Sequence, residues 1–255
     1  DVATNAAATV NEYDLLDVTV SSQGAGSRSV STQLRFVPLI NGNPIPPSPV
    51  IATGTANLSG PARVTNNSAN TDATVWSGLA TTAGMGSTNT ASGGDGVYDN
   101  DANLAALGGD ALFQNFFTES KSTIRSKANY IDCTSGCTGS TTAIQNLDGS
   151  GGIVWIDGDV TFDQPINLGT AANPVTLIVN GNLTLANNNA NIAGMVYVGQ
   201  NWDNGNNAGN VTGTAVVEGN FNATGNLKIT YDEPILNRVG DMGRYAQVPG
   251  SWKDF

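Results

Sequence analysis

The sequence predicts a mainly β protein built around a β-solenoid, or parallel β-helix. Gly makes up 31 of the 255 residues and charged residues only 12%, so short polar turns must form much of the surface. Four segments between residues 151 and 232 repeat one pattern: an apolar strand, a small polar corner and a second apolar strand. Only one stretch, near residues 101–127, has the apolar spacing of an amphipathic helical segment.

The repeat is visible when four corners are aligned. They are Ile156–Val160, Val179–Leu183, Val198–Trp202 and Val217–Phe221, with corresponding positions 23, 19 and 19 residues apart. Each unit continues to a third apolar segment, at Ile166–Leu168, Ile192, Val211 and Leu227–Ile229. A period of about 20 residues with three short strands is typical of a β-solenoid, whose coils share one core. Stacked Asn side chains at the corners are expected to hydrogen-bond from coil to coil.

Three sections are expected to form one continuous globular unit. Residues 1–50 form an N-terminal β section, with alternating runs at Val18–Ser21 and Ser29–Val37, and a Pro-rich connector. Residues 51–150 form an irregular region of strands and loops, with helices near 101–127 and a degenerate coil at Gly54–Gly60. Residues 151–255 hold the solenoid repeats and a C-terminal cap.

The helical segment carries one apolar face after a break at Gly108 and Gly109. Asp110 is expected to cap the second helix. The face consists of Leu112, Phe113, Phe116, Phe117 and Ile124. We interpret it as core that covers an open edge or end of the β part, and a partner-binding helix is the alternative.

Composition excludes several classes of function. Histidine is absent, which excludes Ser-His-Asp catalysis and His-ligated metal sites. The formal net charge is −11 with only 10 Lys and Arg, which argues against a nucleic-acid groove. The sequence contains no apolar run of about 18 residues and is not expected to span a membrane. Of the classes considered, a surface or secreted protein is the one that the composition still allows.

Cys133 and Cys137 are the only cysteines and stand four residues apart. We predict a structural disulfide, which implies an oxidising compartment. The short loop would pin a local corner rather than stabilise the whole fold. A redox pair or half of a metal site is the alternative, although no other Cys or His could complete a tetrahedral site.

No catalytic residues are predicted. The acidic residues of the repeat region lie at corners, with Lys228 the nearby cation: Asp157, Asp159, Asp163 and Glu218. A polysaccharide-active enzyme would need paired carboxylates on one face of the solenoid. We interpret these side chains as solvated turn residues, and such an enzyme is the less favoured alternative.

One acidic stretch has the oxygen ligands that Ca²⁺ prefers. It contains Asp95, Asp99, Asp101 and Asn103, and no other cofactor is indicated. Leu104 stands where such loops have Gly, and Asp110 where they have Glu. An acidic turn that caps the next helix is therefore the alternative.

The chain ends with two large aromatic residues, Trp252 and Phe255. We expect them to plug the C-terminal end of the solenoid core. The alternative is a contact with an assembly partner.

Several segments resemble the soluble domain of PilX-type minor pilins of bacterial type IV pili. The segments are Gly152–Asp159, Leu177–Asn182, Gly225–Asp232 and the closing Val248–Phe255, with a less specific likeness at Phe113–Phe117 and around Ser21–Gly24. The likeness covers most of the chain and is strongest over residues 151–255. It implies a right-handed solenoid.

The resemblance also implies a non-catalytic structural role outside the cell. Such a subunit lies at or near the pilus tip, primes assembly, and supports adhesion, twitching motility or DNA uptake. Its expected partners are other minor pilins, the major pilin and a large tip adhesin. Pilins begin with a basic leader and a long apolar helix, which the sequence from Asp1 onwards does not contain, so membrane contact is expected only through such a helix. A free extracellular adhesin that binds glycans or surfaces, through aromatics such as Trp76 and Trp202, is the alternative.

Overall fold

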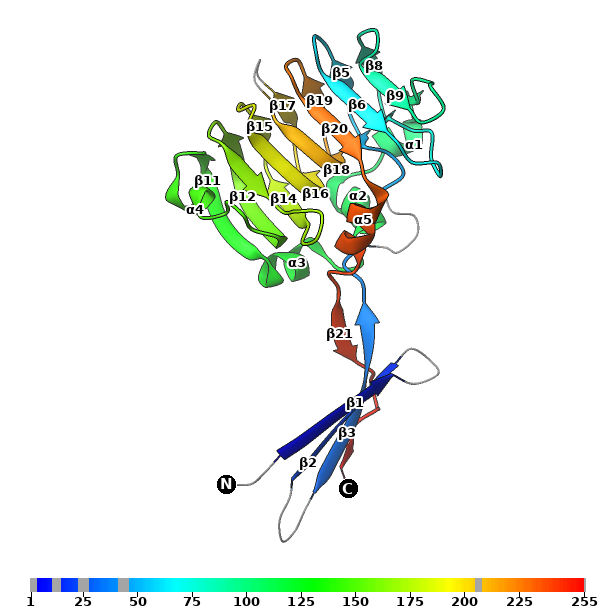
Figure 1. Cartoon of the computed structure of the whole chain (residues 1–255), viewed down its shortest axis with the longest axis vertical. Coiled ribbons are helices and arrows are strands. Elements are labelled where there is room, and N and C mark those ends of the chain that lie inside the picture. Colours follow the sequence, from blue (N-terminus) through cyan, green and yellow to red (C-terminus); the bar gives the residue numbers. More distant parts are fainter. Residues whose placement is uncertain (1–3, 11–14, 23–27, 41–45, 205–207, 255) are drawn as a thin grey trace. The chain divides into compact units, whose positions relative to one another are not determined.

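The computed structural model describes residues 4–10, 15–22, 28–40, 46–204 and 208–254 (Figure 1). It confirms the mainly β class, with 47% strand and 14% helix. Two compact units are present: Asp1–Leu39 with Met242–Phe255, and Ile40–Asp241. This division differs from the single unit with three sections expected from the sequence, because both chain ends join one small sheet.

The first unit is an antiparallel sheet. Its strands are β1 (Thr4–Val10), β2 (Leu15–Ser22), β3 (Ser29–Val37) and β21 (Arg244–Gln247), in the order β1-β2-β3-β21, and β22 (Lys253–Asp254) also pairs with β3. The two alternating runs of the N-terminal section pair with each other, while part of the loop between them, residues 23–27, lies outside the described residues.

The C-terminal segment does not cap the solenoid, so that prediction is wrong. Its backbone pairs with β3 instead, with Lys253 opposite Ser31. Trp252 is 61% exposed and plugs no core. Phe255 lies outside the described residues, and the assembly contact proposed for these aromatics stays a prediction.

The second unit is the solenoid. Its parallel sheet is nearly closed round an axis. The strands after the helices are β11 (Asn129–Thr138), β12 (Gly152–Phe162), β13 (Ile166–Leu168), β14 (Val175–Asn180), β15 (Leu183–Leu185), β16 (Ala190–Val198), β17 (Trp202–Asn204), β18 (Asn210–Val217), β19 (Phe221–Ala223) and β20 (Lys228–Tyr231). The register confirms the repeat, because Ile156 lies opposite Val179, which lies opposite Val198, which lies opposite Val217.

The region before the helices is more regular than expected. It contains β4 (Val50–Ala52), β5 (Ala56–Leu58), β6 (Arg63–Asn66), β7 (Val75–Ser77), β8 (Thr81–Ala83), β9 (Thr88–Thr90) and β10 (Val97–Tyr98). The first three strands stack on β18, β19 and β20, and the next coils follow. The predicted degenerate coil corresponds to β5. The chain therefore enters the stack in its middle and builds outward to β10 (Figure 1).

Helices carry the chain from the β10 end of the stack to the β11 end. They are α1 (Ala102–Ala105), α2 (Gly109–Phe116) and α3 (Lys121–Lys127), and α4 (Thr142–Gln145) and α5 (Glu233–Gly240) follow later. Gly108 caps α2 in place of the predicted Asp110, which lies in the first turn. Among the described helices, none is long and apolar enough to cross a membrane.

The Asn corners form the expected ladder. Asn182 donates to Asp159 Oδ1 through its backbone N–H (2.7 Å) and its side chain (3.0 Å). Asn201 donates to Asn182 Oδ1 in the same two ways, at 3.1 and 3.2 Å. The backbone N–H of Asn220 donates to Asn201 Oδ1 at 2.9 Å, and Thr55 extends the ladder to Asn220. Each coil is thus tied to the next at one corner.

A second stack runs along the outside of the solenoid, and we call it the outer ladder. Parallel register aligns its members in the order Tyr130, Trp155, Ile178, Tyr197, Val216, Ile51, Trp76 and Tyr98. The inward neighbours of these residues form the solenoid core. Trp155 and Tyr197, in the covered part, are 2% and 1% exposed, whereas the end members Tyr130 and Tyr98 are 42% and 54% exposed.

Candidate functional site

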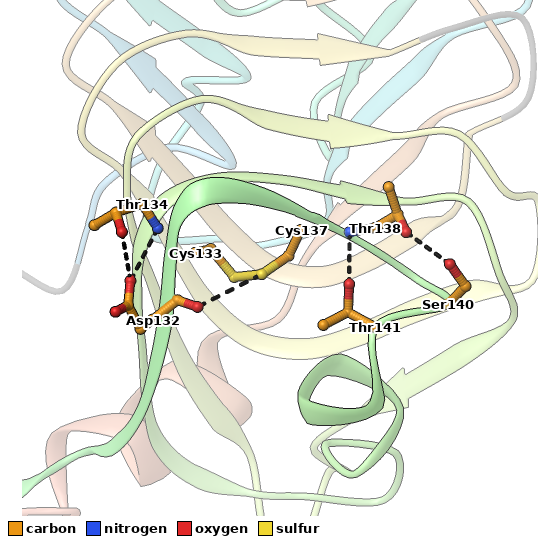
Figure 2. The surroundings of a disulfide bond; sticks show 7 residues. All are labelled: Asp132, Cys133, Thr134, Cys137, Thr138, Ser140 and Thr141. Atoms are coloured by element: carbon orange, nitrogen blue, oxygen red, sulfur yellow. Dashed lines mark hydrogen bonds between the residues drawn. A yellow bond between two sulfur atoms is a disulfide. The ribbon is translucent and has the colours of Figure 1, made fainter.

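The disulfide is present and structural. Cys133 and Cys137 are bonded within β11, with Cα atoms 5.2 Å apart (Figure 2). Ile131 and Cys137 align with Ile156 and Val160 of the next coil, so this corner holds two more residues than its neighbour. Both cysteines belong to the buried core, which makes them part of an enlarged corner at the β11 end. A disulfide is typical of an oxidising compartment.

Figure 2 also shows how the residue before the first cysteine fixes this corner. Asp132 Oδ1 accepts hydrogen bonds from Thr134, at 3.0 Å from the backbone N–H and 2.8 Å from the hydroxyl. The hydrogen bond from the backbone N–H of Thr134, followed by the one from its hydroxyl, holds the pKa of Asp132 below its usual value. Asp132 thus stays ionised and closes the turn from within.

The residues expected to bind Ca²⁺ have other tasks. Asp101 caps α1, because its Oδ1 accepts from the backbone N–H groups of Asn103 (2.9 Å) and Leu104 (3.1 Å). Its Oδ2 accepts from Trp76 Nε1 at 2.9 Å. The bond from Leu104, followed by that from Trp76, holds the pKa of Asp101 below its usual value. The capping alternative therefore describes Asp101.

Of the other acidic residues of that stretch, only Asp99 is shown with its carboxylate engaged. Asp99 Oδ2 accepts from the backbone N–H of Thr81 at 3.0 Å. Asp95 accepts from the Thr74 hydroxyl through its backbone carbonyl rather than its carboxylate. Within the described part of the chain, no three acidic or Cys side chains come together as a metal site. The geometry gives the calcium prediction no support.

Glu218 is not the solvated turn residue that its corner position suggested. Its side chain is 12% exposed and lies 2.6 Å from Lys121 Nζ. Tyr197 donates to the same carboxylate at 2.7 Å. Burial, followed by the neighbouring Glu218 charge, raises the pKa of Tyr197 far above its usual value. A Cβ at Gly109 would collide with this carboxylate, so a larger residue where α2 begins would displace the Glu218 side chain.

Asp157 likewise holds a helix against the solenoid. Arg125 Nη2 lies 2.6 Å from its Oδ2, and Trp155 and Asn180 donate to its Oδ1 at 2.8 and 3.1 Å. Burial opposes ionisation, but the hydrogen bonds from Trp155, Asn180 and Arg125 outweigh it and lower the pKa of Asp157. The solvated interpretation of Asp157 is therefore wrong. Arg125 also lies over the Tyr130 ring, 4.4 Å from its centroid.

The remaining acidic corners are structural too. Asp159 starts the Asn ladder, and Asp163 Oδ1 accepts from the backbone N–H of Gly139 at 2.8 Å. Sequence reasoning missed Lys121, Arg125 and Tyr197 as partners of the acids. For Lys121 and Arg125, the signal in the sequence is their positive charge within the helical stretch.

The first unit presents a mainly apolar face, and none of the described residues of this unit forms a second layer on it. Register places its residues on one side of the sheet, as in the pairs Leu16 with Leu34 and Val20 with Val30. We call this surface the open sheet face. Its described apolar members are Ala6, Ala8, Leu16, Val18, Val20, Val30, Leu34 and Phe36, and Thr32, Gln247 and Asp254 lie on the same side. Most side chains on the opposite side are polar, such as those of Thr19 and Ser31.

Burial values agree with an uncovered face. Val20 is 41% exposed. Among the residues of this unit whose exposure the structure describes, only Leu39 is buried. A sheet with one apolar face normally buries it against another element, so a covering layer is expected.

The second candidate surface lies on the solenoid beside the outer ladder. Trp202 is fully buried and cannot bind a glycan, so that prediction is wrong. Trp76 is partly exposed, and it separates two adjoining hollows of about 480 and 170 Å³. Pro47 and Trp76 line both hollows, and Tyr98 lines the smaller one.

A scan against protein families and a search of curated proteins find no match for the chain.

Proposed function

We propose that the protein is a non-catalytic structural subunit of a surface filament, as its resemblance to PilX-type minor pilins implies. The observation that carries the proposal is the open sheet face. A long apolar helix of the kind that begins pilins would lie across Leu16, Val18, Val20 and Val30 and supply the missing layer. The sheet, rather than the solenoid, is then the part built into the filament.

Other features fit this role. The disulfide suits an extracellular location. The carboxylates of Asp101, Asp157, Asp159 and Glu218 are engaged in a cap, a ladder and helix contacts, which suits a rigid subunit. The proposed partners are other minor pilins, the major pilin and a large tip adhesin. With a net charge of −11, any part in DNA uptake would be carried out through other subunits.

The first test is the encoded precursor upstream of Asp1. A short basic leader followed by about 20 apolar residues would support the proposal. A conventional secretion signal that ends close to Asp1 would overturn it and favour a free extracellular adhesin.

The second test separates the two sides of the sheet in the full-length protein. Val20→Asp places a charge on the open sheet face, and Thr19→Asp places the same charge on the opposite side of the same strand. We expect Val20→Asp to remove the subunit from sheared filaments and Thr19→Asp to leave it there. Equal incorporation of the two variants, at equal cellular abundance, would contradict the proposed helix contact.

A further inference from the structure

We propose that the Trp76 end of the outer ladder is a binding site for a neutral glycan, with one pyranose ring stacked on Trp76 and Tyr98. This inference does not depend on the filament proposal. Tyr98 lies opposite Trp76 in the parallel pairing of β10 with β7. The two rings therefore project from the same side of neighbouring strands, about 4.8 Å apart along the stack.

The aromatic pair is fixed before any ligand arrives. The bond from Trp76 Nε1 to Asp101 Oδ2 sets the orientation of the indole. Asp101 is itself held by the two backbone N–H groups of α1 that it caps. Stacking on such a platform costs little ordering, because the aromatic side chains have few rotatable bonds. Tyr98, at 54% exposure, offers its ring to a ligand from solvent.

The hollows around the pair have suitable size and chemistry. The smaller one is lined by both rings, Pro47, Thr71 and Asp72. The adjoining hollow of about 480 Å³ adds Asn103 and Asn115 to a largely apolar wall and lies within the roughly 300–1,000 Å³ of small-molecule sites. A pyranose has an apolar C–H face for the rings and hydroxyls around its edge. Hydroxyl, amide and carboxylate groups at the rim can bond those hydroxyls.

Charge argues for a neutral ligand. Neither hollow is lined by Lys or Arg, while Asp72 and Asp101 lie at the rims and the chain carries −11. A sialylated or sulfated glycan would meet like charges there without a compensating cation. An apolar peptide segment is the competing occupant. It fits the aliphatic wall of the larger hollow, but it does not account for the paired rings and polar rim of the smaller one.

The experiment uses the whole chain on an array of neutral oligosaccharides of glucose, galactose, mannose and N-acetylglucosamine, beside sialylated and sulfated ones. The variants are Tyr98→Ala and Trp76→Phe. The matched control is Tyr130→Ala, which removes an exposed tyrosine from the opposite end of the same ladder. Circular dichroism checks that each variant is folded. A titration with an amphipathic helical peptide tests whether an apolar peptide segment, the competing occupant, binds instead.

We expect saturable binding of at least one neutral glycan. Tyr98→Ala should weaken it about tenfold or more, the loss that corresponds to about 1.4 kcal/mol of stacking. Trp76→Phe should weaken it too, and Tyr130→Ala should bind as the unmodified protein does. The proposal is overturned if no neutral glycan binds, if only anionic glycans bind, or if Tyr98→Ala and Tyr130→Ala behave alike. Binding of the peptide without any glycan would also overturn it.

Discussion

Replacing Phe113 by Ala tests whether the outer ladder holds the helices on the solenoid. Phe113 is fully buried, and its ring centroid lies 4.2 Å from that of Phe117, 5.0 Å from Tyr197 and 6.3 Å from Trp155. Removing the ring loses about 1.5–3 kcal/mol of burial and leaves a cavity among other rings. The free energy of unfolding should fall by about 3–5 kcal/mol in total.

Urea denaturation followed by the fluorescence of the buried Trp155 and Trp202 measures this loss. With an m-value of about 3 kcal/mol/M, the urea midpoint should fall by roughly 1–1.7 M. Phe113→Leu should cost about 1 kcal/mol, because most of the volume remains. Tyr130→Ala, at the exposed end of the ladder, should cost less than about 1 kcal/mol. The reasoning is refuted if Phe113→Ala costs no more than Tyr130→Ala.

Three further predictions concern the corners and the buried hydroxyls. Asn201→Ala interrupts the Asn ladder between two coils and should lower the free energy of unfolding by about 1–2 kcal/mol; an unchanged urea midpoint would mean that the ladder contributes nothing. The double change Cys133→Ser with Cys137→Ser opens a five-residue loop and should cost about 2 kcal/mol, and a thiol reductant should then no longer affect melting. Tyr231 is buried, and burial followed by Glu233 raises its pKa to about 12. Because the unfolded chain releases this proton first, Tyr231 alone should lower stability by up to about 1.4 kcal/mol per pH unit as pH rises from about 10 to about 12. Tyr231→Phe should lessen that slope, and an equal slope in both proteins would contradict the assignment.

The repeat over residues 151–232 could be predicted because its inward positions are large and evenly spaced. Leu177, Val179 and Leu183 fill the core of one coil, and their equivalents recur every 19–23 residues. The same alignment also indicates that Trp202 is buried. It stands where neighbouring coils have Leu183 and Phe221, at an inward position, so its burial could have been predicted from the repeat.

The coils before the helices carried a weaker signal. Their strands are short, and their inward positions hold small or polar residues such as Ala52, Ala56 and Ser77. These fill less of the core and break the apolar pattern. Their place in the stack could not be predicted at all, because β4 pairs with β18 from a segment about 165 residues away in sequence, and no local pattern encodes such a contact.

The candidate sites show the same difference between features that a local sequence pattern predicts and features that depend on distant contacts. The disulfide could be predicted from two cysteines and the missing metal partners. The roles of Glu218 and Asp157 could not be predicted. Their partners Lys121 and Arg125 come close to them only because the helices run along the solenoid in the folded protein. The open sheet face needed the pairing of β1, β2 and β3, which turns the alternation of each strand into one shared apolar surface.

The path of the chain explains why the two ends of the outer ladder differ. The chain leaves the stack at β10 and re-enters it at β11, so α1, α2 and α3 must run along the solenoid. They cover the ladder around Trp155 and Tyr197, where the Phe113 ring meets that of Tyr197 edge to face. At the β11 end, Arg125 then lies over Tyr130 and bonds Asp157. At the β10 end, the described residues place no such cation over Trp76 or Tyr98. Within the described part of the chain, the topology thus leaves Trp76 and Tyr98 without a covering helix beside the two hollows, and a ligand could stack on the two rings there.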